Sequence, residues 1–185
     1  MGSERHVLAW ALAGAASFWG TPGCGPARPG ASTSPVNVSI SPDSGTGKDQ
    51  VFILTYSDPG GHANLRDVRV LFNAGLDGRA ACYVYFSPPD RALRLVNDAG
   101  NGSNRTVAGS VETLENSQCM VRAGESTASG TGEVLKLTLS LTFKPNFDGV
   151  RNIYIYAANT QGLETGLLWR GRWTVPGTFV RSTSR

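Results

Sequence analysis

The side chains that could carry out catalysis are few in this sequence of 185 residues. Histidine, the most common general base, occurs only at His6 and His62. His6 lies in an N-terminal export-like segment, so a serine–histidine–aspartate triad would depend entirely on His62. The sequence around it, S-D-P-G-G-H-A-N, is typical of a surface turn, and no G-x-S-x-G or H-E-x-x-H motif occurs. We therefore expect no enzyme; one would need a cleft that joins His62 to two carboxylates.

Oxygen-bearing side chains near His62 suggest a metal ion as the alternative chemistry. Asp58, Asn64 and Asp67 cluster around one predicted loop. Hard oxygen ligands of this kind suit Ca²⁺. The same residue types also cap turns, and no contiguous D-x-D-x-D-G loop is present. We expect no cofactor, with a calcium site at these three residues as the alternative.

Four tyrosines have the greatest potential for binding. Tyr83 and Tyr85 lie on one predicted strand and Tyr154 and Tyr156 on another, each pair opposite the core-facing residues of its strand. If the two strands are neighbours, the rings form an exposed ladder that could stack on sugars or anchor a protein partner. The alternative is that the rings pack on one another, or under a loop such as 97–110, and only stabilise the sheet.

The last predicted strand carries further aromatic and basic residues. Alternation over residues 167–175 predicts one face made up of Leu167, Trp169, Trp173 and Val175. Arg170 and Arg172 then lie on the opposite face. A solvated strand face is the simpler interpretation of these two arginines, and an anion site is the alternative.

The element that must organise these residues is the stretch 133–144, E-V-L-K-L-T-L-S-L-T-F-K. One parity consists of Leu135, Leu137, Leu139, Leu141 and Phe143, which predicts a β-strand with one buried face. No convincing amphipathic helix is available to cover that face, so we expect a second sheet. Similar runs separated by turn signals predict a two-sheet antiparallel β-sandwich of about eight or nine strands. In the first strand, Val36, Val38 and Ile40 share one face.

The three cysteines are Cys24, near the N-terminus, and Cys82 and Cys119 in the body of the chain. Val84 and Val121 each follow a body cysteine by two positions, so both thiols could face one core. In an exported protein two such cysteines are expected to form a disulfide. A zinc site, which needs three or four ligands, and a reactive thiol are the alternatives.

The N-terminus resembles an export signal, with Arg5 and His6 before an apolar run over 7–19. We expect a signal peptide at 1–23, a flexible linker at 24–35, the sandwich at 36–176 and a disordered tail at 177–185. Lipid attachment at Cys24, as in bacterial lipoproteins, is an alternative to simple secretion. Residues 21 and 22, Thr and Pro, depart from the lipoprotein pattern.

Composition limits the partners. The net charge of +3 from 17 Lys+Arg and 14 Asp+Glu is mild, which argues against a nucleic-acid partner. Beyond the first two dozen residues, no apolar run approaches the ~20 residues of a membrane span. We therefore expect contact with a membrane only through a lipid anchor.

Six stretches of the sequence carry a family resemblance. They are residues 41–61 (S-P-D-S-G-T-G-K-D-Q-V-F-I-L-T-Y-S-D-P-G-G), 97–100 (N-D-A-G), 114–119 (L-E-N-S-Q-C), 137–149 (L-T-L-S-L-T-F-K-P-N-F-D-G), 152–163 (N-I-Y-I-Y-A-A-N-T-Q-G-L) and 171–176 (G-R-W-T-V-P). In these stretches the chain resembles the immunoglobulin-like or fibronectin-type-III-like sandwich repeats of secreted bacterial surface proteins of the acidobacterial type. Unlike antibody domains, it has no tryptophan between Cys82 and Cys119.

The resemblance implies an immunoglobulin-like sandwich but no particular activity. We expect a non-enzymatic, extracytoplasmic binding or spacer module at a bacterial cell surface, secreted or lipid-anchored, whose partner is a surface protein or a glycan. The alternative is a carbohydrate-binding domain that uses the tyrosine face.

Overall fold

The computed structural model describes residues 33–177. The predicted signal peptide, Cys24, and nearly all of the predicted linker and tail lie outside the described residues. Every element below belongs to the unit Ser32–Arg185. Between residues 33 and 177, no helix has the length and apolar character needed to cross a membrane.

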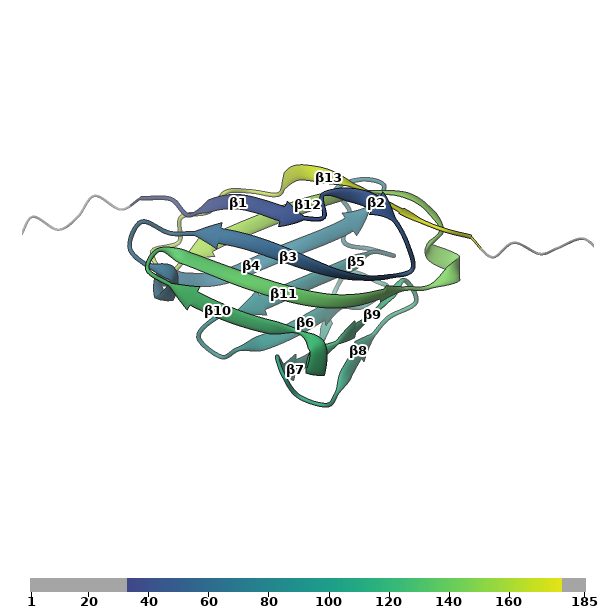
Figure 1. The fold of residues 1–185 in the computed structure, drawn as a ribbon, viewed down its shortest axis with the longest axis horizontal. Coiled ribbons are helices and arrows are strands. Elements are labelled where there is room, and N and C mark those ends of the chain that lie inside the picture. Colours follow the sequence, from purple (N-terminus) through teal and green to yellow (C-terminus); the bar gives the residue numbers. More distant parts are fainter. Residues whose placement is uncertain (1–32, 178–185) are drawn as a thin grey trace, which may run out of the picture. The chain divides into compact units, whose positions relative to one another are not determined.

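Thirteen strands in this part of the chain form two sheets that lie in separate layers (Figure 1). The six-stranded sheet contains, in order, β1 (Val36–Ser41), β3 (Asp49–Ser57), β11 (Val134–Phe143), β9 (Cys119–Arg122) and β8 (Thr113–Glu115), with β10 (Thr127–Thr131) also paired to β11. The seven-stranded sheet contains, in order, β2 (Ser44–Thr46), β13 (Leu168–Val175), β12 (Gly149–Asn159), β4 (Leu65–Asn73), β5 (Cys82–Ser87), β6 (Ala92–Val96) and β7 (Ser103–Val107). Three short 3₁₀ turns are η1 (His62–Asn64), η2 (Ala123–Glu125) and η3 (Pro145–Phe147).

The predicted two-sheet β-sandwich is confirmed. The sheets contain more strands than expected because β2, β7 and β10 formed in stretches that look like turns or loops in the sequence. These three strands lie at sheet edges and are mostly polar and exposed. An edge strand needs no buried face, so it leaves no apolar alternation in the sequence. One pairing, β2 with β13, is parallel; the others are antiparallel.

The core lies between the sheets and is organised around β11, as its alternation predicts. The apolar side of this strand is at most 3% exposed and consists of Leu135, Leu137, Leu139, Leu141 and Phe143. Aromatic rings from both sheets meet at one end of it. The ring centroid of Phe52 on β3 lies 4.9 Å from that of Phe72 on β4 and 5.2 Å from that of Trp173 on β13. Such contacts add to the stabilisation from apolar burial.

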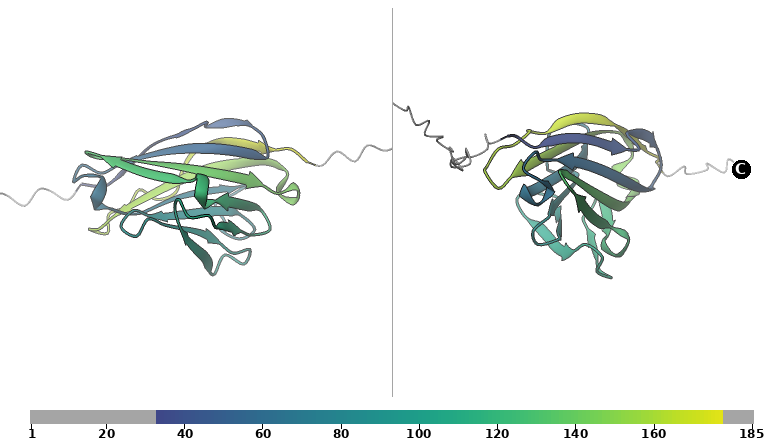
Figure 2. Two further views of the ribbon diagram at one scale, coloured as in Figure 1. Left: turned by 60° about the horizontal axis from the view of Figure 1, so that its bottom comes forward. Right: turned by 60° about the vertical axis from the view of Figure 1, so that its left-hand side comes forward.

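The order of the strands is immunoglobulin-like. β1-β3-β11-β9 corresponds to A-B-E-D, and β13-β12-β4-β5-β6 corresponds to G-F-C-C′-C″ of a variable-type domain. The chain passes from one sheet to the other between β1 and β2, so β2 lies beside β13 at the sheet margin (Figure 2).

The predicted disulfide is confirmed. Cys82 on β5 and Cys119 on β9 are joined by an S–S bond of 2.04 Å, and both residues are fully buried. The bond therefore links the two sheets through the core. An antibody-type disulfide would join the strands that correspond here to β3 and β12, so this bridge lies elsewhere in the same kind of sandwich. Neither cysteine therefore has a free thiol to bind zinc or to react as a nucleophile.

The prediction that Val36 and Ile40 share a face is wrong. The pairing of β1 with β3 shifts register between Asn37 and Ser39. Val36 is consequently 50% exposed, whereas Ile40 is buried. An extra residue on one strand reverses the alternation of every side chain beyond it.

The prediction that Trp169 and Trp173 share a face is wrong for the same reason. On β12, Ile153 pairs with Gly171 but the next residue, Tyr154, pairs with Trp169. Arg170 lies between these two partners in the sequence, where the register shifts, so β13 contains a bulge. Trp173 is 3% exposed, whereas Trp169 is 54% exposed on the other face of the sheet.

Candidate functional site

The four tyrosines predicted to form a platform all lie on the outer face of the seven-stranded sheet, away from the core. Their strands are not neighbours, because β4 lies between β5 and β12. Cross-strand pairing arranges this face in two rows, which we call the aromatic face. One row is Trp169, Tyr154, Leu71 and Tyr83; the other is Tyr156, Arg69, Tyr85, Arg94 and Arg105.

Arg69 occupies the gap that β4 leaves between the tyrosine strands. Its guanidinium carbon lies 4.4 Å from the ring centroid of Tyr85 and 4.3 Å from that of Tyr156. Its Nε donates to Asp67 Oδ2 at 2.9 Å. Burial by itself would lower the pKa of Arg69, but hydrogen bonds with Asp67 and Tyr83 outweigh it and raise the pKa overall. The result is a fixed cation between two rings, which stabilises the face.

The tyrosines differ in how much of each ring reaches solvent. Tyr83 is 8% exposed and Tyr156 is 7% exposed, whereas Tyr85 and Tyr154 are half-buried. Tyr83 and Tyr85 contact each other edge to face, with centroids 4.6 Å apart. Burial, followed by a hydrogen bond with Glu164, raises the pKa of Tyr156 to about 12. Much of the tyrosine surface is therefore used in packing within the sheet.

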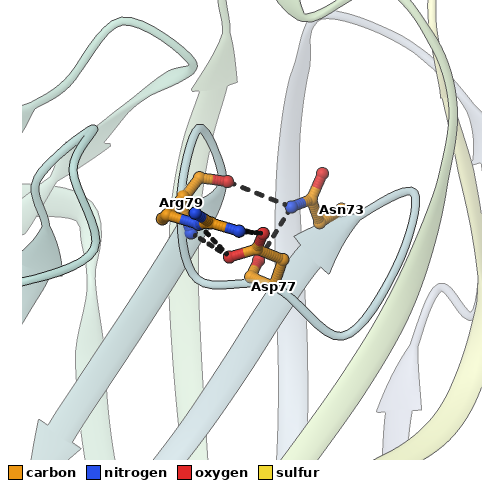
Figure 3. A network of polar contacts seen from close by, with 3 residues as sticks. All are labelled: Asn73, Asp77 and Arg79. Carbon is orange, nitrogen blue, oxygen red and sulfur yellow. Dashed lines mark hydrogen bonds and ion pairs between the residues drawn. The ribbon is translucent and has the colours of Figure 1, made fainter.

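Two loops border the β5 end of the aromatic face. In the first, the Asn73 side-chain amide donates to the carbonyls of Asp77, at 2.7 Å, and Arg79, at 3.3 Å, and Arg79 forms an ion pair with Asp77 at 2.8 Å (Figure 3). The Arg79 hydrogen bonds lower the pKa of Asp77. The amide of Ala80 donates to the carbonyl of Asp98 in the second loop. A hollow of about 260 Å³ lies beside that loop, lined in part by Tyr83 and Tyr85.

The opposite edge of the aromatic face presents an exposed indole. Trp169 is 54% exposed and its neighbour Leu168 is 40% exposed. The guanidinium carbon of Arg172 lies 6.0 Å from the Trp169 ring centroid, and Arg172 Nε donates to Asn152 Oδ1 at 3.3 Å. A hollow of about 420 Å³ adjoins the indole, lined by Asp43, Ser44, Trp169, Arg170, Gly171 and Arg172.

This exposed edge was not expected from the sequence, because a strict alternation places Trp169 on the same side as Trp173. The available signal was Gly171, a glycine inside a strand pattern, which often marks a bulge or a close approach of another backbone. Both apply here. A Cβ on Gly171 would lie 1.9 Å from the carbonyl oxygen of Asp43.

The structure brings together two of the three residues proposed for calcium. Asp58 is fully buried, and Asn64 Nδ2 donates to its Oδ1 at 2.9 Å. Asp58 also accepts from the Gly60 amide, at 2.8 Å, and from Asn159 Nδ2, at 3.1 Å. Asp67 instead lies on the aromatic face, paired with Arg69. Among residues 33–177 there is no group of three or more His, Cys, Asp or Glu side chains that could hold a metal ion.

The His62 side chain packs against the hairpin formed by β10 and β11. Its Nδ1 lies 2.9 Å from the carbonyl oxygen of Gly132. A Cβ on Gly130 would lie 1.9 Å from the imidazole Cδ2, so the ring packs directly on the backbone of β10. These contacts attach η1 to the β10–β11 hairpin.

Comparison with known proteins gives little further information. No protein-family model matches the chain, and no match was found among curated proteins. Among solved structures, the chain is similar to "Structure or murine CRIg", with 14% sequence identity and a TM-score of 0.35 over 80% of this chain and 100% of that chain. A match at this level carries no argument about function.

Proposed function

We propose that the domain is a non-enzymatic binding or spacer module that functions outside the cytoplasm, at a bacterial cell surface. The buried Cys82–Cys119 disulfide supports this location, because such bonds form and persist in oxidising compartments. The immunoglobulin-like order of the strands is compatible with many functions, so the binding site must be argued from surface residues.

The binding surface in this proposal is the aromatic face, with its exposed end at Trp169. One observation carries the assignment. Trp169 is 54% exposed at the margin of a face that already contains four tyrosines. The outward side of β11, by comparison, carries Lys136, Thr138 and Thr142 and no aromatic residue. Exposed tryptophan is among the residues most enriched at the energetic centres of interfaces.

Carbohydrate binding is the second candidate, and the same indole favours it. A planar aromatic ring provides an apolar surface for the C–H face of a sugar. Trp169 presents more of its surface to solvent than Tyr83 or Tyr156. In this version of the proposal the sugar stacks on Trp169, with Tyr154 beside it in the same row.

A glycan array probed with the full chain tests the surface and the ligand class together. We expect wild type to bind a subset of glycans and Trp169→Ala to lose that binding. Leu76→Ala is the matched control, since it removes a 63% exposed apolar side chain from a loop outside both rows. Glycan binding that survives in Trp169→Ala would contradict the assigned surface. A wild-type chain that binds no glycan would contradict carbohydrate binding and favour the spacer or protein-binding version.

Anchoring at Cys24 is a separate part of the proposal. Palmitate labelling of the full chain in a bacterial host would distinguish a lipoprotein from a secreted protein. We expect label in wild type and none in Cys24→Ser if the anchor exists. Equal labelling of wild type and Cys24→Ser, or no label in either protein, would contradict a lipid anchor at Cys24.

A further inference from the structure

The hollow beside Trp169 combines three kinds of chemistry on one edge of the sheet. Trp169 supplies a half-exposed indole, Arg172 an exposed guanidinium, and Asp43 and Ser44 a carboxylate and a hydroxyl. Arg170 also lines the hollow, with one guanidinium nitrogen donating to the Trp169 carbonyl at 3.1 Å. The space of about 420 Å³ lies within the range typical of small-molecule sites.

The backbone holds these groups in fixed positions. The bulge at Arg170 turns Trp169 outward, while the amide of Arg172 donates to the Asp43 carbonyl at 2.9 Å. That hydrogen bond fastens the segment before β2 to β13. Gly171 leaves room for the close approach, because any Cβ there would collide with Asp43. The indole and the arginine are therefore presented by β13, and the aspartate by the short turn between β1 and β2 that is hydrogen-bonded to β13.

The charges indicate an anionic ligand with hydroxyl groups. Arg172 is exposed, and no carboxylate among residues 33–177 forms an ion pair with it. Guanidinium groups match carboxylates in geometry and form charge-assisted hydrogen bonds with them. The Asp43 carboxylate can accept from a ligand hydroxyl, and Ser44 can donate or accept. The indole requires an apolar surface on the same ligand.

We propose that this hollow binds an acidic saccharide, with a hexuronate residue stacked on Trp169. A hexuronate unit has an apolar C–H face for the indole, a carboxylate for Arg172 and hydroxyls for Asp43. A free phosphate has no apolar face, and a neutral sugar offers no charged group to the Arg172 guanidinium. This inference rests on the proposed binding function and specifies its ligand class.

Calorimetric titration of the full chain tests the ligand class directly. The probes are the trimers of galacturonate and of mannuronate, each beside its methyl ester, which keeps the backbone and removes the charge. We expect at least one acid to bind about tenfold or more tightly than its ester, the scale of one charge-assisted hydrogen bond. We expect Arg172→Gln to reduce that ratio towards one, and Trp169→Ala to weaken acid and ester together.

Lys136→Gln is the matched charge control. Lys136 is exposed on β11 in the six-stranded sheet, outside the aromatic face, and its replacement changes the net charge equally. An acid-to-ester ratio that falls as much in Lys136→Gln as in Arg172→Gln would overturn the assigned site. Equal binding of acid and ester by wild type would overturn the acidic class and leave the binding function in place.

Absence of binding to all four trimers would also overturn the inference. The glycan array then decides the broader proposal independently. Other glycans that bind wild type and not Trp169→Ala would uphold the aromatic face as a binding surface. No glycan at all would remove carbohydrate binding as well.

Discussion

Gly171 on β13 faces the carbonyl of Asp43 so closely that a Cβ would lie 1.9 Å from the Asp43 oxygen. The neighbouring amide of Arg172 donates to the same oxygen at 2.9 Å. This contact fixes the position of the segment leading into β2 and, with the bulge at Arg170, the outward position of Trp169. A glycine without a side chain is thus required to build the exposed edge of the aromatic face.

Gly171→Ala should separate the two backbones at this point. We expect a loss of unfolding free energy of about 1–3 kcal/mol, because the added methyl must displace backbone atoms and not a flexible side chain. Denaturant unfolding measures it. Gly75→Ala is the control, since a Cβ there meets nothing within 4 Å. Equal stability of the two variants would contradict the close contact.

Removal of the disulfide should destabilise the sandwich by about 3–4 kcal/mol, the loop-closure effect expected for its sequence separation of 37 residues. Thermal melting of wild type with and without reductant, beside the double variant Cys82→Ala/Cys119→Ala, measures this. Reductant should lower the melting temperature of wild type and leave the double variant unchanged. A wild-type melt that does not respond to full reduction would show that the bond contributes little.

Stability should fall in alkaline solution as tyrosines of the aromatic face ionise. The pKa of Tyr156 rises from 10.0 to about 12, and burial also raises the pKa of Tyr85. The unfolded chain therefore loses these protons before the folded chain does. The stabilisation that Tyr156 provides is complete below pH 10 and is lost as the pH rises to about 12. Between pH 10 and pH 12 the melting temperature of Tyr156→Phe should fall less steeply than that of wild type. If the melting temperatures of the two proteins fall in parallel, the raised pKa of Tyr156 is contradicted.

Asp58→Ala should be among the most destabilising single substitutions. It would leave donors of Gly60, Asn64 and Asn159 without their acceptor inside the protein, at a cost of about 2–4 kcal/mol. Chemical denaturation compares it with Asp90→Ala, which alters an exposed carboxylate. A similar effect of both changes would mean that water replaces the buried hydrogen bonds.

Calcium should have no effect on stability. Both Asp58 oxygens accept hydrogen bonds from protein donors, and Asp67 is paired with Arg69. The melting temperature should therefore be the same in excess Ca²⁺ and in a chelator. A higher melting temperature in Ca²⁺ that disappears in Asp58→Asn would establish the metal site.

The sequence alone determined the features that depend on local periodicity. Alternation predicted β11 with its buried leucines. The pairing of Cys82 with Cys119 was expected from two body cysteines in an exported protein, and their parity allowed both to face one core. These predictions hold because a buried strand face must be apolar at every second residue, whatever its neighbours are. The parity of Tyr154 and Tyr156 likewise placed both rings on the face opposite the core-facing Ile153 and Ile155.

Which strands are neighbours, and where the alternation breaks, became known from the folded structure. β4 separates the tyrosine strands and inserts Arg69 between them, and the bulge at Arg170 moves Trp169 to the outer face. Neither fact can be derived from one strand, because pairing order and register depend on hydrogen bonds between segments far apart in the chain. The hollow beside the indole likewise depends on the approach of Asp43 to Gly171, a contact across more than a hundred residues of sequence.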